Sequence, residues 1–113
     1  MAEQKALYID GNWATTSDTV VNINPSDTND VIGEYAQANS EHVNNALAAA
    51  NRAVGEWGVS PMETRYQVLM AIGNELIERS GELGELLARE EGKTRAEGVG
   101  EVYRSGQFFH YFA

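Results

Sequence analysis

Two groups of residues in this sequence have types and spacings that could do chemistry. The tripeptide Gly92-Lys93-Thr94 is similar to the end of a phosphate-binding loop. Such a loop carries its first glycine five residues before the second, because that glycine lets the backbone curl until its N–H groups face the phosphates. Here that position is Leu87, within an apolar helical pattern, and carboxylates that would repel a phosphate follow it. The tripeptide is therefore interpreted as a joint between two helices.

The second group is a set of carboxylates on the same stretch, at Glu82, Glu85, Glu90 and Glu91. Paired carboxylates can serve as general acid and base, but carboxylates at helical spacing are more typical of a solvated helix face. Ser105 lacks the upstream glycine of a nucleophile elbow. We therefore expect no catalytic residue in this chain.

Cysteine is absent, which excludes a disulfide framework, a thiolate zinc site and a thiol nucleophile. His42 lies in a polar first helical turn, where a solvated imidazole is expected. His110 lies among aromatic residues, where packing is expected, because no second histidine, cysteine or inward-facing aspartate stands at metal-ligand spacing from it.

The charge balance limits the partners of this chain. Seventeen acidic residues against eight basic ones give a formal net charge of −9, which opposes binding to DNA, RNA or anionic lipid. The N-terminal stretch MAEQKALYIDGNW has no long apolar region typical of a signal peptide, and no apolar run approaches the roughly 20 residues of a membrane helix. We expect a cytoplasmic protein without nucleic-acid or membrane partners.

The first third of the chain, residues 1–39, predicts β-hairpins. Four short strands are expected, over residues 7–9, 12–14, 19–23 and 31–36. Asp10-Gly11 is a two-residue hairpin signal because both positions tolerate positive φ, and residues 24–30 have turn chemistry. Strands this short and few are not stable alone, so they must lie on something larger.

Residues 40–113 change to a helical period and predict about four helices, so the segment is α+β. The first helix has apolar residues at steps of three and four, namely Val43, Ala46, Leu47, Ala50, Val54 and Trp57. Ser60 to Glu63 predicts a capping box with Pro61 at the first helical position. The length allows one domain with one core, in which the apolar stripes, Trp13 and Trp57 would be buried.

The joint at residues 92–94 follows from the same reasoning. Gly92 suits the left-handed position after a helix, and Lys93 favours the negative end of the helix dipole. Thr94 and Glu97 predict a capping box that starts the last helix at once. That helix directs Val99, Val102, Tyr103, Gly106, Phe109 and His110 toward one side. It reaches Phe108-Phe109-His110-Tyr111-Phe112-Ala113 without a polar cap, so a partner surface and a truncated chain are expected.

Taken in order along the chain, several short sequence motifs resemble the N-terminal segment of the aldehyde dehydrogenase superfamily. The stretches that carry the resemblance are YIDGNW (8–13), NPSDTNDVIG (24–33), ALAAANRAVGEW (46–57), PMETR (61–65), EEGK (90–93) and FHYFA (109–113). Each alone is common, but their joint order and spacing cover nearly the whole chain. The amino-acid sequence of residues 24–35 is most similar to the corresponding stretch of dehydrogenases of 2-oxoglutarate semialdehyde and related semialdehydes.

The resemblance implies an α/β parent enzyme, with residues 1–113 forming the N-terminal part of its NAD(P)-binding domain. Such enzymes oxidise an aldehyde with NAD or NADP: a cysteine thiolate attacks the carbonyl, an asparagine holds the oxyanion and a glutamate activates water. In the family these residues and the cofactor fingerprint lie downstream. The segment alone is therefore expected to be inactive, to bind no cofactor, and to support the rest of its chain and sister subunits.

Some family members also bind Na⁺ or K⁺ through backbone oxygens before the Asn-Pro turn and an acidic side chain near the Gly-Lys motif. The matching positions here are Asn22, Ile23 and Glu91, although glutamate replaces aspartate. A solvated carboxylate at a helix end is the competing interpretation of Glu91. The alternative for the whole chain is an autonomous acidic helical module whose aromatic end docks a partner protein.

Overall fold

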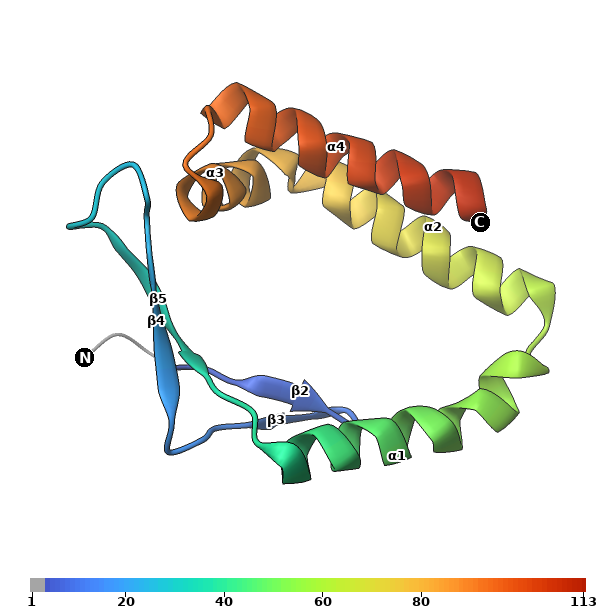
Figure 1. Cartoon of the computed structure of the whole chain (residues 1–113). Helices are drawn as coiled ribbons and strands as arrows, with labels where there is room; N and C mark the ends of the chain where they lie inside the picture. Colours follow the sequence, from blue (N-terminus) through green and yellow to red (C-terminus); the bar gives the residue numbers. More distant parts are fainter. Residues whose placement is uncertain (1–3) are drawn as a thin grey trace. The chain divides into compact units, whose positions relative to one another are not determined.

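The computed structural model describes residues 4–113, which form short strands followed by helices (Figure 1). The strands are β1 (Gln4–Lys5), β2 (Leu7–Ile9), β3 (Asn12–Ala14), β4 (Thr19–Ile23) and β5 (Val31–Ala36). The helices are α1 (Ser40–Gly58), α2 (Met62–Glu78), α3 (Ser80–Glu91) and α4 (Arg95–Phe112). The α+β content and the four expected helices are confirmed.

Packing divides the described residues into two compact units. Unit 1 contains residues 4–23 and 29–59, and unit 2 contains residues 24–28 and 60–113. Within the described part of the chain, the buried apolar side chains are Ala88 and Val102, both in unit 2, and no large side chain is fully buried. The single well-filled core expected from the sequence is therefore absent from these residues.

The strands of unit 1 form two small sheets. β2 and β3 make the hairpin predicted around Asp10-Gly11, whose φ angles are +52° and +75°. β4 pairs antiparallel with β5, and β1 pairs parallel with β5, so the strand order is β1-β5-β4. β1 was not predicted, because two residues carry no periodicity and the strand exists only through pairing with a distant segment.

Helix α1 of unit 1 begins with a capping box. The side-chain oxygen of Asn39 accepts from the backbone N–H of His42 at 3.1 Å, and His42 Nδ1 accepts from the backbone N–H of Asn39 at 3.2 Å. The imidazole predicted to be merely solvated thus caps the helix. α1 contacts β2, and Arg52 Nη2 lies 2.7 Å from Asp10 Oδ2.

The apolar stripe predicted on α1 is not buried. α1 has no buried residue, and Leu47 is 63% exposed. The expectation that both tryptophans anchor a core is also wrong within this structure, since Trp13 is 73% and Trp57 46% exposed. The reason is length: α1 extends about 28 Å, whereas strands of three residues cover only about 10 Å of it.

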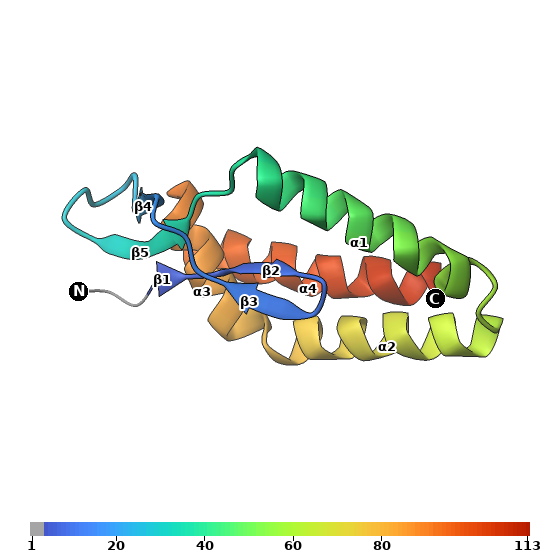
Figure 2. The same cartoon turned by 90° about the horizontal axis from the view of Figure 1, so that it is seen from below.

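Helices α2, α3 and α4 make up most of unit 2. α4 packs against both α2 and α3, and Figures 1 and 2 show α2 and α4 lying alongside each other. Glycines form the contacts. A Cβ at Gly98 would lie 2.2 Å from the carbonyl oxygen of Gly84, and a Cβ at Gly106 would lie 2.7 Å from that of Gly73. The helix backbones therefore touch directly.

The start of α2 corrects one prediction. Pro61 is the N-cap residue of α2, no side chain caps the helix, and the helix begins at Met62. Ser60 instead receives hydrogen bonds from Arg65 Nη1, at 2.6 Å on its carbonyl oxygen and at 3.5 Å on its hydroxyl. The capping box expected at Ser60 does not form, because proline occupies the cap position itself rather than the first helical one.

Candidate functional site

The joint between α3 and α4 is built as predicted. Gly92 ends α3 in the left-handed conformation with φ of +74°. A Cβ at Gly92 would also lie 2.9 Å from Pro25 Cγ and 3.0 Å from Ser26 Oγ, and Ser26 Oγ donates to the carbonyl oxygen of Gly92 at 3.3 Å. Glycine is required twice, by the backbone angle and by the turn of residues 24–28 that packs against it.

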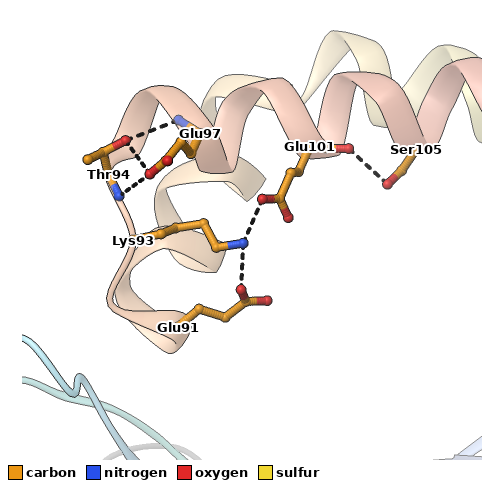
Figure 3. Close-up of polar contacts among 6 residues, drawn as sticks. All are labelled: Glu91, Lys93, Thr94, Glu97, Glu101 and Ser105. Carbon is orange, nitrogen blue, oxygen red and sulfur yellow. Dashed lines mark hydrogen bonds and ion pairs between the residues drawn. The ribbon is translucent and has the colours of Figure 1, made fainter.

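Lys93 bridges two carboxylates across the joint (Figure 3). Its Nζ lies 2.5 Å from Glu91 Oε2 and 2.7 Å from Glu101 Oε1, and its side chain is only 19% exposed. Hydrogen bonds to Glu101 and then Glu91 raise the pKa of Lys93 above its usual value. The ammonium group is neutralised by these carboxylates. It therefore links α3 to α4 and is not placed as a phosphate-binding group.

Thr94 and Glu97 form the predicted capping box (Figure 3). Thr94 Oγ1 accepts from the backbone N–H of Glu97 at 3.3 Å, and Glu97 Oε2 accepts from the backbone N–H of Thr94 at 3.1 Å. The Thr94 hydroxyl also donates to Glu97 Oε2 at 2.7 Å, and this bond is the main reason that the pKa of Glu97 is lowered. Gly92, Lys93 and Thr94 are thus confirmed as a helix–turn–helix joint.

Glu82 and Glu85 on α3 are each held by an arginine. Arg79 contacts Glu82 through Nε at 3.1 Å and Nη2 at 2.9 Å, and these hydrogen bonds lower the pKa of Glu82. Arg95 Nε lies 3.1 Å from Glu85 Oε2. All four side chains are largely exposed, as expected for a solvated helix face.

His110 contributes to packing between α4 and α2. Its Nε2 lies 2.9 Å from Asn74 Oδ1, and a Cβ at Gly73 would come within 2.4 Å of the imidazole. In residues 4–113, no group of three or more histidine, cysteine, aspartate or glutamate side chains could hold a metal ion. The same described range contains no helix long and apolar enough to cross a membrane.

The Gly-x-Gly run of the helical region does not have the placement of a dinucleotide fingerprint. The only Gly-x-Gly run of the helical region, Gly98 to Gly100, lies inside α4 instead of at a strand-to-helix turn. Gly98 is occupied by contact with Gly84, at which a Cβ would lie 2.4 Å from Val99 Cα. Gly98 therefore serves helix packing, and no cofactor step can be derived through this run.

The three residues predicted to hold a monovalent cation fall in different parts of the molecule. Asn22 and Ile23 belong to β4 in unit 1, and the pairing register with β5 shifts between them. Such a bulge disrupts the regular ladder and redirects backbone groups. Glu91 belongs to unit 2 and contacts Lys93. The cation site stays a prediction.

The aromatic end of α4, for which the sequence predicted a partner surface, is exposed in this structure. Phe108, Tyr111 and Phe112 project from α4, are 57%, 81% and 72% exposed, and are here called the aromatic ridge. A pocket of about 340 Å³ lies along it, lined also by Arg104 and Gln107. A second pocket of about 230 Å³ is lined by Leu69, Phe108, Phe109 and Phe112.

Comparison with known proteins shows the family of this chain. The profile of the aldehyde dehydrogenase family matches residues 13–113. The α-ketoglutarate semialdehyde dehydrogenase of Haloferax volcanii is 36% identical over 115 residues, which cover 100% of this chain and 24% of that protein. The 1-pyrroline-5-carboxylate dehydrogenase 2 of Bacillus subtilis is 33% identical, covering 95% of this chain and 21% of that protein.

Solved structures agree. Betaine aldehyde dehydrogenase from Staphylococcus aureus, in complex with NAD⁺, matches with a TM-score of 0.88 and 31% identity, covering 98% of this chain and 23% of that one. A 3,6-anhydro-L-galactose dehydrogenase matches with a TM-score of 0.89 and 28% identity, covering 96% and 23%. This chain thus spans about a quarter of the length of these relatives. It belongs to the aldehyde dehydrogenase family.

Proposed function

We propose that this chain is the N-terminal part of an NAD(P)-dependent aldehyde dehydrogenase, in which it serves as structural support. The observation that carries the proposal is the mismatch of coverage: the similarity runs along 100% of this chain but only 24% of the H. volcanii relative. A segment with two buried apolar side chains has the surface of an internal piece of a larger fold. Its exposed apolar residues would be covered by the remainder of the enzyme.

The chemistry of aldehyde oxidation explains why the segment alone would be inactive. A hydride can leave an aldehyde carbon only after a nucleophile has added to the carbonyl, and a negatively charged oxygen must be stabilised during that step. The chain has no cysteine, and Gly98 is committed to packing against Gly84 of the neighbouring helix. The nucleophile and the binding groups for NAD or NADP would therefore lie outside these 113 residues.

The substrate proposed for the parent enzyme is a semialdehyde, with 2-oxoglutarate semialdehyde as the specific candidate. Support comes from the amino-acid sequence of residues 24–35 and from the 36% identity to the α-ketoglutarate semialdehyde dehydrogenase. The proposed partners are the remainder of the same chain and sister subunits, in a cytoplasmic setting. A full-length protein carrying this segment should oxidise this semialdehyde with higher kcat/KM than betaine aldehyde.

The alternative, an autonomous acidic helical module, is favoured only by the aromatic ridge. An independent domain of this size buries roughly two-thirds of the surface that its unfolded chain exposes. Here Val54, Leu47 and Trp57 all lie exposed on α1, which does not meet that requirement. The exposure of α1 therefore favours the proposal that this chain is a segment of a larger enzyme.

A chimera tests the proposal. The 113 residues replace the matching 23% of the S. aureus betaine aldehyde dehydrogenase, and NADH formation from betaine aldehyde is followed at 340 nm. We expect activity within about tenfold of the unmodified host, because the helices and hairpins have matching geometry. The host lacking its segment, and the 113-residue chain alone, should form no NADH. Turnover by the isolated chain, or an unfolded chimera, would refute the proposal.

A further inference from the structure

We propose that His42 is a pH-sensitive switch at the start of α1, closed when its imidazole is neutral and open when the imidazole is protonated. The observation that carries the proposal is the direction of one hydrogen bond, which runs from the backbone N–H of Asn39 to His42 Nδ1 at 3.2 Å. The switch involves residues of unit 1 only, so it does not depend on the proposed function.

This hydrogen bond fixes where the imidazole carries its proton. A backbone N–H can only donate, so Nδ1 must offer a lone pair and the neutral ring carries its proton on Nε2. Protonation would add a second N–H at Nδ1, pointing at the N–H of Asn39, and two donors cannot bond each other. Histidine is the side chain whose charge ordinarily changes between about pH 5 and 8. The imidazolium form therefore cannot close the cap.

The position of the ring on α1 adds a second penalty for the imidazolium. The first turn of a helix carries a partial positive charge from its N–H groups. In this turn the Asn39 side chain accepts from the backbone N–H of His42 at 3.1 Å, and the carbonyl oxygen of Asn39 accepts from that of Val43 at 3.1 Å. A cation held against this end is repelled, so protonation drives the ring away from the Asn39 N–H.

Two carboxylates offer the imidazolium a different neighbour. Glu41 precedes His42 on α1, and Asp18 lines with His42 a pocket of about 380 Å³. Asp18 is the only acidic or basic residue besides His42 among the residues that line this pocket. Strand β2, which α1 also contacts, contributes the titratable hydroxyl of Tyr8, which ordinarily stays neutral in this pH range. The carboxylates attract the imidazolium, so the open state places the ring toward the pocket.

The pocket lets the switch open without unfolding its surroundings. Its wall is held by the carbonyl oxygen of Asp18, which accepts from Thr16 Oγ1 at 2.6 Å and from the backbone N–H of Gln37 at 2.9 Å. Neither bond involves the imidazole. Opening is therefore a turn of one side chain.

Opening the switch weakens the start of α1. α1 has no buried residue, so its first turn depends on the two reciprocal cap bonds more than on packing. The chain passes from β5 to α1 through residues 37–39 (Figure 1). Loss of the acceptor at His42 leaves the Asn39 N–H to water and frays this junction between sheet and helix.

The test uses the fact that the chain has only two histidines. His42→Gln keeps an acceptor at the third position of the capping box and removes the titration. His110→Gln is the matched control, because it removes the other imidazole and leaves the cap intact. The backbone amide of Asn39 and the ring carbons of His42 are followed by NMR in the 113-residue chain, from about pH 8 to about pH 5.

We expect the Asn39 amide and the His42 ring to titrate with one midpoint in the unsubstituted chain and in His110→Gln. In His42→Gln the Asn39 amide should not titrate in this range. At about pH 5 its hydrogen exchange should be about fivefold faster in the unsubstituted chain than in His42→Gln, and at about pH 7.5 the two rates should agree. Comparing variants at one pH cancels the intrinsic pH dependence of exchange.

The chimera with the S. aureus host provides the same measurement in a full-length enzyme. Hydrogen exchange of the peptide that contains residues 37–42 is read by mass spectrometry in the chimera with and without His42→Gln. Faster exchange in the chimera that retains His42, at about pH 5 only, is expected. The proposal is overturned if the Asn39 amide ignores the titration of His42, if it titrates equally in His42→Gln, or if the two chimeras exchange alike at both pH values.

Discussion

Helices α1 and α4 are both amphipathic and both start with a capping box, yet they are used differently. α1 has the more regular apolar stripe and no buried residue, whereas α4 buries Gly98, Val102 and Gly106. The difference teaches that periodicity marks the face a helix will bury but does not say what covers it. In α4 the partner lies within the same unit, because glycines let α2 and α3 approach its backbone.

Within the 113-residue chain, the largest effect is expected from a substitution that prevents the close approach of α3 and α4. In Gly98→Ala, the added Cβ would lie 2.2 Å from the Gly84 carbonyl oxygen, which no rotamer can relieve. We expect a loss of about 2–3 kcal/mol in the free energy of unfolding of the 113-residue chain. Urea titration of the far-ultraviolet circular dichroism measures it.

Gly100→Ala is the control for that substitution on the same helix. Nothing lies within 4 Å of a Cβ at Gly100, so the helix should gain about 1 kcal/mol from the better helix former. If the two substitutions had the same effect, close backbone contact would not be what holds α4 in unit 2.

A smaller effect on the unfolding free energy is expected at the two positions where the sequence predicted helix caps. Thr94→Ala removes the hydroxyl that accepts from the Glu97 backbone N–H, and should cost about 1 kcal/mol in unfolding free energy. Ser60→Ala should cost less than about 0.5 kcal/mol, because the α2 cap position is Pro61. Both variants are compared by urea unfolding. A larger loss from Ser60→Ala than from Thr94→Ala would contradict the observed helix starts.

Substitutions in the apolar stripe of α1 should have little effect on the unfolding free energy of the isolated chain. Leu47 is 63% exposed, so Leu47→Ala should change the unfolding free energy by less than about 0.5 kcal/mol. In the chimera the same substitution should cost about 2–5 kcal/mol, if the stripe becomes buried there. Thermal unfolding of both proteins gives the comparison. A cost that is equally small in both would leave the stripe without a covering element.

The smallest expected effects are changes in the pH dependence of unit 2. The pKa of Glu97 is lowered by Thr94, so its contribution is present above the usual glutamate pKa and is lost as pH falls through the lowered value. The pKa of Lys93 is raised by Glu101 and Glu91, so its contribution is present below the usual lysine pKa and is lost as pH rises through the raised value.

Two variants separate the limbs of that pH profile. Glu97→Gln should flatten the acid limb of the unfolding midpoint against pH, and Lys93→Met should flatten the alkaline limb. Each variant serves as the control for the other, because the limb it does not affect should match that of the unsubstituted chain. If the acid limb of Glu97→Gln coincided with that of the unsubstituted chain, the Glu97 carboxylate would contribute nothing to the pH dependence of stability.

Much of the local structure could be predicted because it depends on neighbouring residues. The strands over residues 7–9, 12–14, 19–23 and 31–36 are confirmed with those boundaries. Gly92 and the Thr94 cap are also confirmed, since a left-handed glycine and a threonine three residues before a glutamate act within one turn. His42 was missed as a cap because the pattern normally has glutamate or glutamine at that position.

The remaining errors concern contacts between distant residues. β1 forms by pairing with β5, and the contact between Gly84 and Gly98 joins two helices, so neither leaves a periodic signal. Trp13 and Trp57 were expected to anchor a core, but both are exposed, since burial also requires a facing surface. The resemblance to the family was carried by the order of short motifs, which needs no knowledge of contacts.

The sequence by itself determined the four helices, the strands from β2 to β5, the turn at Gly92, the cap at Thr94 and the absence of a thiol nucleophile, because these depend on residue type and short-range spacing. Only the tertiary structure decided which apolar faces are covered: Val102 is buried between glycine-lined helices, while Leu47 and Tyr111 stay exposed. The physical reason is that amphipathicity is a property of one element, whereas burial is a property of two surfaces in contact.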